Sequence, residues 1–158
     1  MSANDPQTLI SAIAAAGEEF AALVESLTPV QFHRRPEPDA WSAAEIAGHV
    51  SEAPVTFAAH ALRVAANPGA AVGRALDEPG RLAALKRLGN AGPSEAGALV
   101  RQGVGQAVEM LSTMPAEGWQ ALGQSARLGA VPMLQFIDSV VLQHIRGHIT
   151  QAREAAGA

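Results

Sequence analysis

The sequence predicts an all-α protein that folds as a four-helix bundle in a single domain over residues 1–158. In four long stretches, apolar residues recur three and four positions apart, the spacing of a helix with one buried face. No stretch shows the alternation of apolar and polar residues that is typical of a strand. With 158 residues, 48% hydrophobic and 16% charged, the chain is long enough to bury one core. Four long helices in so small a domain favour a bundle.

The first helix is expected to begin at Asp5–Pro6, because an aspartate N-cap followed by proline is typical of a helix start. Its apolar stripe continues to about Leu27, and Thr28–Pro29 is expected to end it. Residues 34–39 then form a polar loop, whose charged residues and prolines do not favour regular structure.

The second helix is expected to open at Ser42, because Ser42 and Glu45 have the spacing of a capping box. Pro54 lies inside its apolar stripe and should bend the helix without ending it, since the pattern resumes unchanged. The sequence Asn-Pro-Gly at residues 67–69 is expected to end this helix. It also begins a long connection, residues 67–79. Extended at about 3.3 Å per residue, this connection can return along the bundle, so the second and third helices can run parallel.

The third helical region is expected to start near Gly80, to break at residues 89–93 and to restart at a second capping residue, Ser94. It continues to Pro115, and Trp119 follows in an expected loop. Glycines inside the region weaken the helix, but they permit close contact with a neighbouring helix.

The last helix, expected from about Val131 or Pro132 to Ala155, carries two histidines in its apolar row. A helix buries such a row, and buried imidazoles need hydrogen-bond partners. A metal ion bound by both rings satisfies this need most simply. The row, spaced 3, 4, 3 and 4, consists of Leu134, Ile137, Val141, His144 and His148.

His49 occupies the apolar stripe of the second helix and is the candidate for a third metal ligand. Taken alone, it is more typical of a core histidine with a hydrogen-bond partner. If the second and last helices are neighbours, His49 converges with His144 and His148 inside one end of the bundle. Imidazole suits zinc, nickel and iron(II), and three protein ligands leave positions open, as in catalytic sites.

Three acidic residues lie where they could assist these histidines. Glu45 precedes His49 by four positions, so it could accept the second N–H of that ring or serve only as a cap. Glu52 follows His49 by three and is a candidate general base, although an ordinary exposed glutamate has the same pattern. Asp138 lies beside the apolar row of the last helix and could orient a histidine.

Two further residues are candidates for the rim of a cofactor or substrate pocket. His60 lies about 16 Å beyond His49 along the helix, so it cannot share the ion and is expected at the rim or on a backbone carbonyl. Gln151 follows His148 by three positions and is expected near the pocket mouth. His33 falls in the polar loop region and is expected to be solvated.

Composition and missing motifs exclude several classes of protein. The formal net charge of −4 and the scattered arginines argue against nucleic-acid binding, and no apolar run indicates a membrane span. There is no cysteine, no Glu-x-x-His pair of di-iron bundles, no H-E-x-x-H and no phosphate-binding glycine loop. Bis-histidine haem is left open without positive support. Residues 1–5 lack the pattern of a signal peptide, which favours a cytoplasmic protein.

Two segments carry a family resemblance. Residues 41–50, WSAAEIAGHV, resemble the W-S-x-x-E-[IL]-x-x-H-[LV] signature of the DinB-like (DNA-damage-inducible, YfiT-like) superfamily. Residues 136–153, with H-x-x-x-H-x-x-Q, are similar to its closing motif. The resemblance implies helices in up-down-down-up order, a divalent metal (zinc or nickel) on His49, His144 and His148, and a homodimer.

The resemblance also implies a range of activities. Characterised relatives include bacillithiol transferases and the metal-binding domain of mycothiol-dependent maleylpyruvate isomerase, some of whose relatives have a carboxylate at one ligand position. This chain has histidine at all three. The leading interpretation is a metal-dependent transferase that joins a low-molecular-weight thiol to a small electrophile. The alternatives are a metal-dependent hydrolase and a non-catalytic helical binding or dimerisation protein with a structural or vestigial metal.

Overall fold

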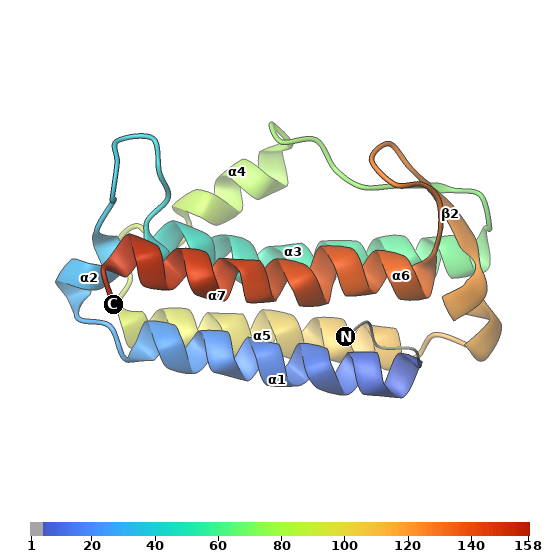
Figure 1. The fold of residues 1–158 in the computed structure, drawn as a ribbon, viewed down its shortest axis with the longest axis horizontal. Coiled ribbons are helices and arrows are strands. Elements are labelled where there is room, and N and C mark those ends of the chain that lie inside the picture. The colour runs from blue at the N-terminus through green and yellow to red at the C-terminus, as the bar shows by residue number, and fades with distance from the viewer. Residues whose placement is uncertain (1–4) are drawn as a thin grey trace.

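The four-helix bundle that the sequence predicts is confirmed in a computed structural model, which describes residues 5–158. Residues 1–4, part of the segment on which the expected absence of a signal peptide rests, lie outside the described residues. Long helices lie side by side along the molecule (Figure 1). They are α1 (Pro6–Glu25), α3 (Ala43–Ala66), α5 (Pro93–Ser112), and a last helix formed by α6 (Met133–Ile137), the π-helical turn η2 (Asp138–Leu142) and α7 (Gln143–Ala156).

In Figure 1, α3 and α5 start at the same end of the bundle, whereas α1 and the last helix run the other way. The chain between α3 and α5 therefore returns along the length of the bundle. This connection contains a short strand, β1 (Ala71–Val72), and an eight-residue helix, α4 (Pro79–Lys86). Helix α4 packs against α3, while α5 packs against both α1 and α3.

The first helix ends earlier than expected, at Glu25, and a short helix follows it. Thr28 does not simply terminate α1; its hydroxyl accepts from the N–H of Gln31, and the Gln31 side chain accepts from the N–H of Thr28. This reciprocal capping box begins α2 (Pro29–His33), which the sequence analysis missed. The capping-box signal was present in the sequence as Thr-Pro-Val-Gln.

The capping box predicted for the second helix is present. Ser42 accepts from the N–H of Glu45 at 3.2 Å, and the Glu45 carboxylate accepts from the N–H of Ser42 at 2.8 Å. Pro54 lies inside α3, which continues past it to Ala66. Helix α5 starts two residues earlier than expected, with Gly92 as its N-cap in place of Ser94.

A small three-stranded sheet corrects the expectation that the chain has no strand. Strand β1 pairs in parallel with β2 (Leu122–Ser125), and β2 pairs antiparallel with β3 (Gly129–Pro132). Strands of two to four residues are too short to show a periodic pattern. Because residues 129–132 pair with β2, the last helix begins at Met133, after the expected start. Trp119 lies buried in a 3-10 turn, η1 (Ala116–Gln120), and not in a loop.

Two glycines set how closely elements approach α3. A Cβ atom on Gly103 of α5 would lie 1.9 Å from the carbonyl oxygen of Ser51, so only glycine fits where α5 meets α3. A Cβ atom on Gly48 would lie 2.1 Å from the carbonyl oxygen of Ala84 in α4. The backbone contacts at these glycines hold α3 between α4 and α5.

By length and composition alone, α1 is apolar enough to cross a membrane, which the sequence analysis did not expect: it has 20 residues and a mean hydropathy of 1.2 in its most apolar window. In the structure, 44% of that window is buried, and α1 packs against α5 and α7. Here α1 is a core helix of the bundle.

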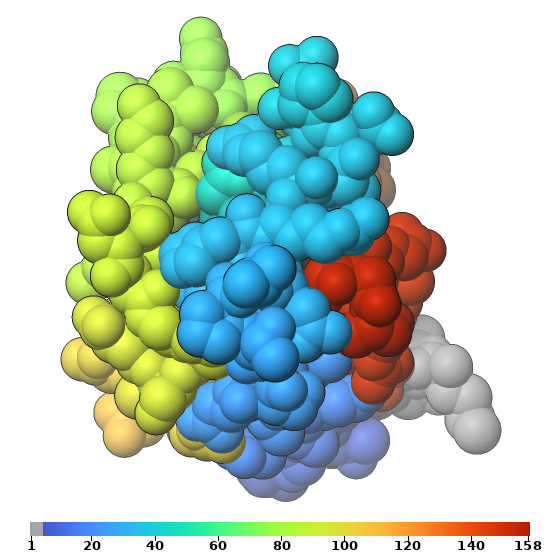
Figure 2. All heavy atoms as spheres, turned by 90° about the vertical axis from the view of Figure 1, so that its left-hand side faces the viewer, coloured from blue at the N-terminus to red at the C-terminus, as the bar shows by residue number. Residues whose placement is uncertain are grey.

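One end of the bundle is covered by the segment between α1 and α3. Figure 2 faces this end, where residues 26–42 lie between the start of α5 and the end of α7. Arg34 donates to the carbonyl oxygen of Ala155 at 2.6 Å, so the loop is tied to the last turn of α7.

Candidate metal centre

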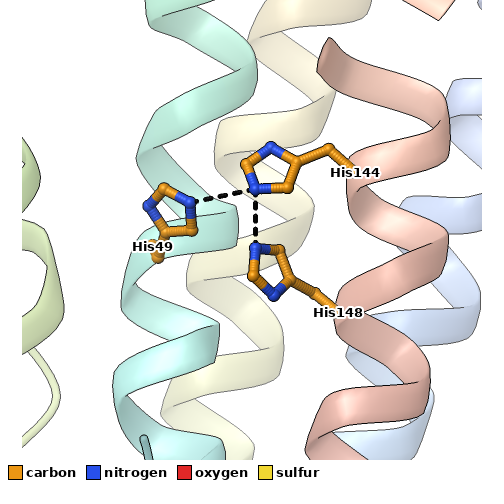
Figure 3. Close-up of side chains that lie close together, drawn as sticks. All are labelled: His49, His144 and His148. Carbon is orange, nitrogen blue, oxygen red and sulfur yellow. Dashed lines mark hydrogen bonds between the residues drawn. The ribbon is translucent and has the colours of Figure 1, made fainter. Parts of the chain in front are cut away.

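The structure brings together the three histidines that the sequence singles out. His49 projects from α3, and His144 and His148 project from successive turns of α7 toward it (Figure 3). The Nε2 atoms of His49 and His144 are 3.2 Å apart, and those of His144 and His148 are 2.7 Å apart. Each residue offers one ligand atom, and these atoms all lie within 4.8 Å of one another.

In both α7 histidines, His144 and His148, the Nδ1 atom is hydrogen-bonded to an oxygen, which orients the ring. His144 Nδ1 lies 3.1 Å from the carbonyl oxygen of Val140, and His148 Nδ1 lies 2.7 Å from Oε1 of Gln151. Because these oxygens only accept, each Nδ1 carries the ring proton. Each Nε2 is then left with a lone pair aimed into the cluster. Gln151, expected at the pocket mouth, thus holds the His148 ring.

The cluster fits a divalent cation. Two lone pairs that face each other 2.7 Å apart, on His144 and His148, repel unless a proton or a cation lies between them. His49 can donate its single ring proton to only one of them. A metal ion accepts all three lone pairs at once, and neutral imidazole is a preferred ligand of zinc, nickel and iron(II). In metal-binding histidines, the ring nitrogen that does not bind the metal is typically hydrogen-bonded to an oxygen, as Nδ1 is in His144 and His148.

Burial keeps these rings neutral. The side chain of His49 is 3% exposed, and burial, together with His144 and His148, lowers the pKa of His49 to about 3. Burial, with the neighbouring His144, lowers the pKa of His148 to about 4. The pKa of His144 is also lowered, mainly by burial and further by nearby arginines. The neutral form of each ring is the form that binds a metal.

The structure does not place Glu45 on the ring of His49. Its carboxylate accepts from Ser42 at the helix N-terminus and forms an ion pair with Arg35. His49 Nδ1 is buried and has no hydrogen-bond partner among residues 5–158. Of the two roles considered for Glu45, helix capping is the one that the structure shows.

The other acidic candidates are also engaged away from the cluster. Glu52 forms a 2.6 Å ion pair with Arg74 and accepts from the hydroxyl of Thr56, also at 2.6 Å. Asp138 accepts from the side-chain amide of Gln143 at 3.2 Å and from no histidine in the described chain. Neither residue is placed to exchange a proton at the cluster.

The remaining histidines lie outside the cluster. His60 is half-buried, and its Nδ1 accepts from the backbone N–H of Gly73 at 3.4 Å; it was expected at a pocket rim or on a carbonyl. His33 is exposed, as expected, and it also binds the carbonyl oxygen of Ala91 at 2.9 Å.

Trp41 forms a wall of the cluster that sequence reasoning used only as part of a family signature. Its ring packs edge-on to His49, with centroids 5.5 Å apart, and stacks near His148 at 6.1 Å. The guanidinium of Arg81, from α4, lies 5.1 Å from the centre of the Trp41 ring. Trp41 and α4 therefore cover one side of the cluster.

A pocket of about 850 Å³ adjoins the cluster at His144, the one histidine of the three that lines it. Such a volume is typical of small-molecule sites. The lining of the pocket includes apolar side chains and polar ones: Phe57, Val72, Phe136 and Val140, and Arg74, Ser125, Arg127, Ser139 and Gln143. Many of these residues lie in the short strands and their turns, so no helical pattern could have identified them.

The π-helical turn η2 shapes both the pocket and the cluster. The N–H of Gln143 bonds to the carbonyl oxygen of Asp138, five residues earlier, so the helix is widened just before His144. Val140, inside this turn, lines the pocket and accepts the ring N–H of His144. Such turns are frequent at functional sites.

The fold and the histidine cluster together define a class of helical-bundle protein with a candidate metal site. The chain belongs to the DinB superfamily, whose family profile matches residues 12–152. Its structure is similar to YfiT from Bacillus subtilis, described as a probable metal-dependent hydrolase with an unusual four-helix bundle topology. The two have a TM-score of 0.78 and 16% sequence identity, over 99% of this chain and 89% of that one. No curated protein matches the sequence. The family resemblance is confirmed.

Proposed function

We propose that this protein binds a divalent metal through His49, His144 and His148 and transfers a low-molecular-weight thiol to a small electrophile. The convergence of three neutral imidazoles beside a small-molecule pocket carries the proposal. When bound, the cation would supply Lewis acidity that lowers the pKa of the thiol and holds it as a thiolate.

The protein's own residues support a reaction without a side-chain base. Glu45 and Glu52 are both tied to arginines, so neither is free to abstract a proton near the cluster. Thiol transfer does not need such a base, because the thiol proton can pass to solvent. The sulfur then bonds to the electrophilic carbon, whose leaving group departs with its electron pair. Phe57 and Phe136 provide apolar surface for the electrophile and exclude water.

A metal-dependent hydrolase is the second candidate. It is favoured by the structural similarity to YfiT, which is described as a probable enzyme of that kind. The two candidates differ in one measurable respect, since hydrolysis does not require an added thiol.

The test is elemental analysis of freshly purified protein, followed by a panel of thiols against a chloronitroarene and an alkyl halide. Turnover should require both metal and thiol, and should be lost in His144→Ala and in the triple variant with alanine at all three histidines. His33→Ala is the matched control, since that ring is exposed and outside the cluster. Circular dichroism checks that each variant is folded.

Each outcome separates the candidates. Thiol-independent breakdown of ester or amide substrates would replace the transferase with the hydrolase. Undiminished turnover in folded His144→Ala would eliminate both. Substoichiometric metal without thiol reactivity would favour the non-catalytic binding or dimerisation protein. The homodimer implied by the family resemblance is also a proposal, and light scattering after size exclusion tests it.

A further inference from the structure

The pocket beside His144 is lined by two arginines, of which one is paired with carboxylates and the other is not. The side chain of Arg74 is 8% exposed and forms ion pairs with Glu52 and Glu78, so its charge is compensated. Arg127 forms no ion pair with any carboxylate in residues 5–158. The uncompensated positive charge of the pocket is therefore that of Arg127.

Arg127 is held at the pocket by the turn between β2 and β3. The hydroxyl oxygen of Ser125 accepts from the backbone N–H groups of Arg127 at 3.3 Å and Leu128 at 3.2 Å, which fixes the turn. Gly129, with φ of +71°, then turns the chain into β3. The side chain is exposed, so a dissolved molecule can reach it without unfolding the turn.

The guanidinium of Arg127 also has a polar neighbour in the π-helical turn η2. One N–H donates to the hydroxyl oxygen of Ser139 at 3.2 Å, across the gap between the hairpin and the π-helical turn. The hydroxyl proton of Ser139 is then free to donate to a ligand, and the guanidinium has further N–H groups to offer. A planar guanidinium with a neighbouring hydroxyl matches a carboxylate, which accepts two parallel hydrogen bonds.

The same pocket is also lined by the apolar side chains of Phe57, Phe136 and Val140. We propose that Arg127 and Ser139 bind the carboxylate of a co-substrate, and that this pocket thereby selects small molecules with an apolar body and one carboxylate. Assigning the carboxylate to a co-substrate rests on the proposed function. Binding itself does not, because none of the histidines is needed for the contact.

The test uses metal-free protein, so that no cation competes for the carboxylate. Calorimetry compares 3-phenylpropionate with its neutral amide, 3-phenylpropanamide. The native protein should prefer the carboxylate by about tenfold or more, the range expected of charge-assisted hydrogen bonds. Arg127→Gln should remove this preference, and Ser139→Ala should reduce it. Arg146→Gln is the matched control, because Arg146 is an exposed arginine of α7 outside the pocket lining and the charge change is the same.

Several results would overturn the proposal: equal binding of acid and amide, no binding of either, a preference that survives Arg127→Gln, or an equal loss in Arg146→Gln. Failure of thiol transfer would leave this binding result unaffected, so the two proposals fail separately. In the active enzyme, carboxylated and neutral members of the thiol and electrophile panels show which co-substrate carries the group. Arg127→Gln should raise KM for that carboxylated member alone.

Discussion

Acid should destabilise the metal-free protein through its buried histidines. In the unfolded chain, histidine titrates near pH 6.5, about its ordinary pKa. In the folded chain, burial lowers the pKa of His49 to about 3 and that of His148 to about 4. At pH values between the ordinary histidine pKa and these lowered pKa values, the two histidines bind protons in the unfolded chain but not in the folded chain. The free energy of unfolding therefore falls as the pH falls below about 6.5, and the loss levels off below the folded pKa values.

The size of this loss in free energy of unfolding follows from the pH interval over which the folded and unfolded chains differ in protonation. Each ring loses about 1.36 kcal/mol per pH unit. At pH 5, about 1.5 units below the unfolded pKa, the loss is about 2 kcal/mol per ring, or about 4 kcal/mol for His49 and His148 together. This is a large part of a typical domain's stability of about 5–15 kcal/mol.

The assay is urea denaturation of EDTA-treated protein at pH 7.5 and pH 5, followed by circular dichroism. The double variant His49→Leu, His148→Leu should lose much less stability between these two pH values than the native protein does. His33→Gln is the control and should keep the native pH dependence, since it leaves the cluster intact. Equal native stability at the two pH values, or an equal loss in the double variant, would refute the reasoning.

Three further results are expected. Zinc at about 100 times its Kd should raise the free energy of unfolding at neutral pH by about 2.7 kcal/mol in thermal or chemical denaturation, and His144→Ala should abolish this gain. Gln151→Ala should weaken zinc binding measured by competition with a chelator by about 10–100-fold, because the His148 ring loses its acceptor; unchanged affinity would contradict that role. Gly103→Ala should destabilise the fold by about 1–3 kcal/mol through its clash with α3. Gly105→Ala in the same helix, with open space around it, should stabilise by up to about 1 kcal/mol; equal effects would refute the contact.

The long helices and the convergence of the histidines could be predicted because both depend on helical periodicity. His144 and His148 are four residues apart, so they share a face in any regular helix. His49 lies on the buried stripe of a helix with a clear capping signal. The hydrogen bond from His148 to Gln151 was also within reach, since residues three apart on a helix are neighbours.

The surroundings of the site could not be predicted in the same way. The partners of Glu45 and Glu52 are Arg35 and Arg74, which lie in irregular segments whose position no spacing rule gives. Ser125 and Arg127, which line the pocket, belong to a hairpin of four-residue strands that carry no periodic signal. The positions of these residues are set by tertiary contacts and not by the local sequence.

The π-helical turn η2 sets the angular position, around the axis of the last helix, of the residues that follow it. Each residue of a helix advances the chain by about 100° around its axis. If the same residues formed an ordinary α-helical turn, with none removed, everything after them would therefore be rotated by about that angle relative to Phe136. His144 and His148 would then face away from His49 while the helix itself stayed intact. The meeting of the three rings thus depends on one additional residue in the spacing of a single helix.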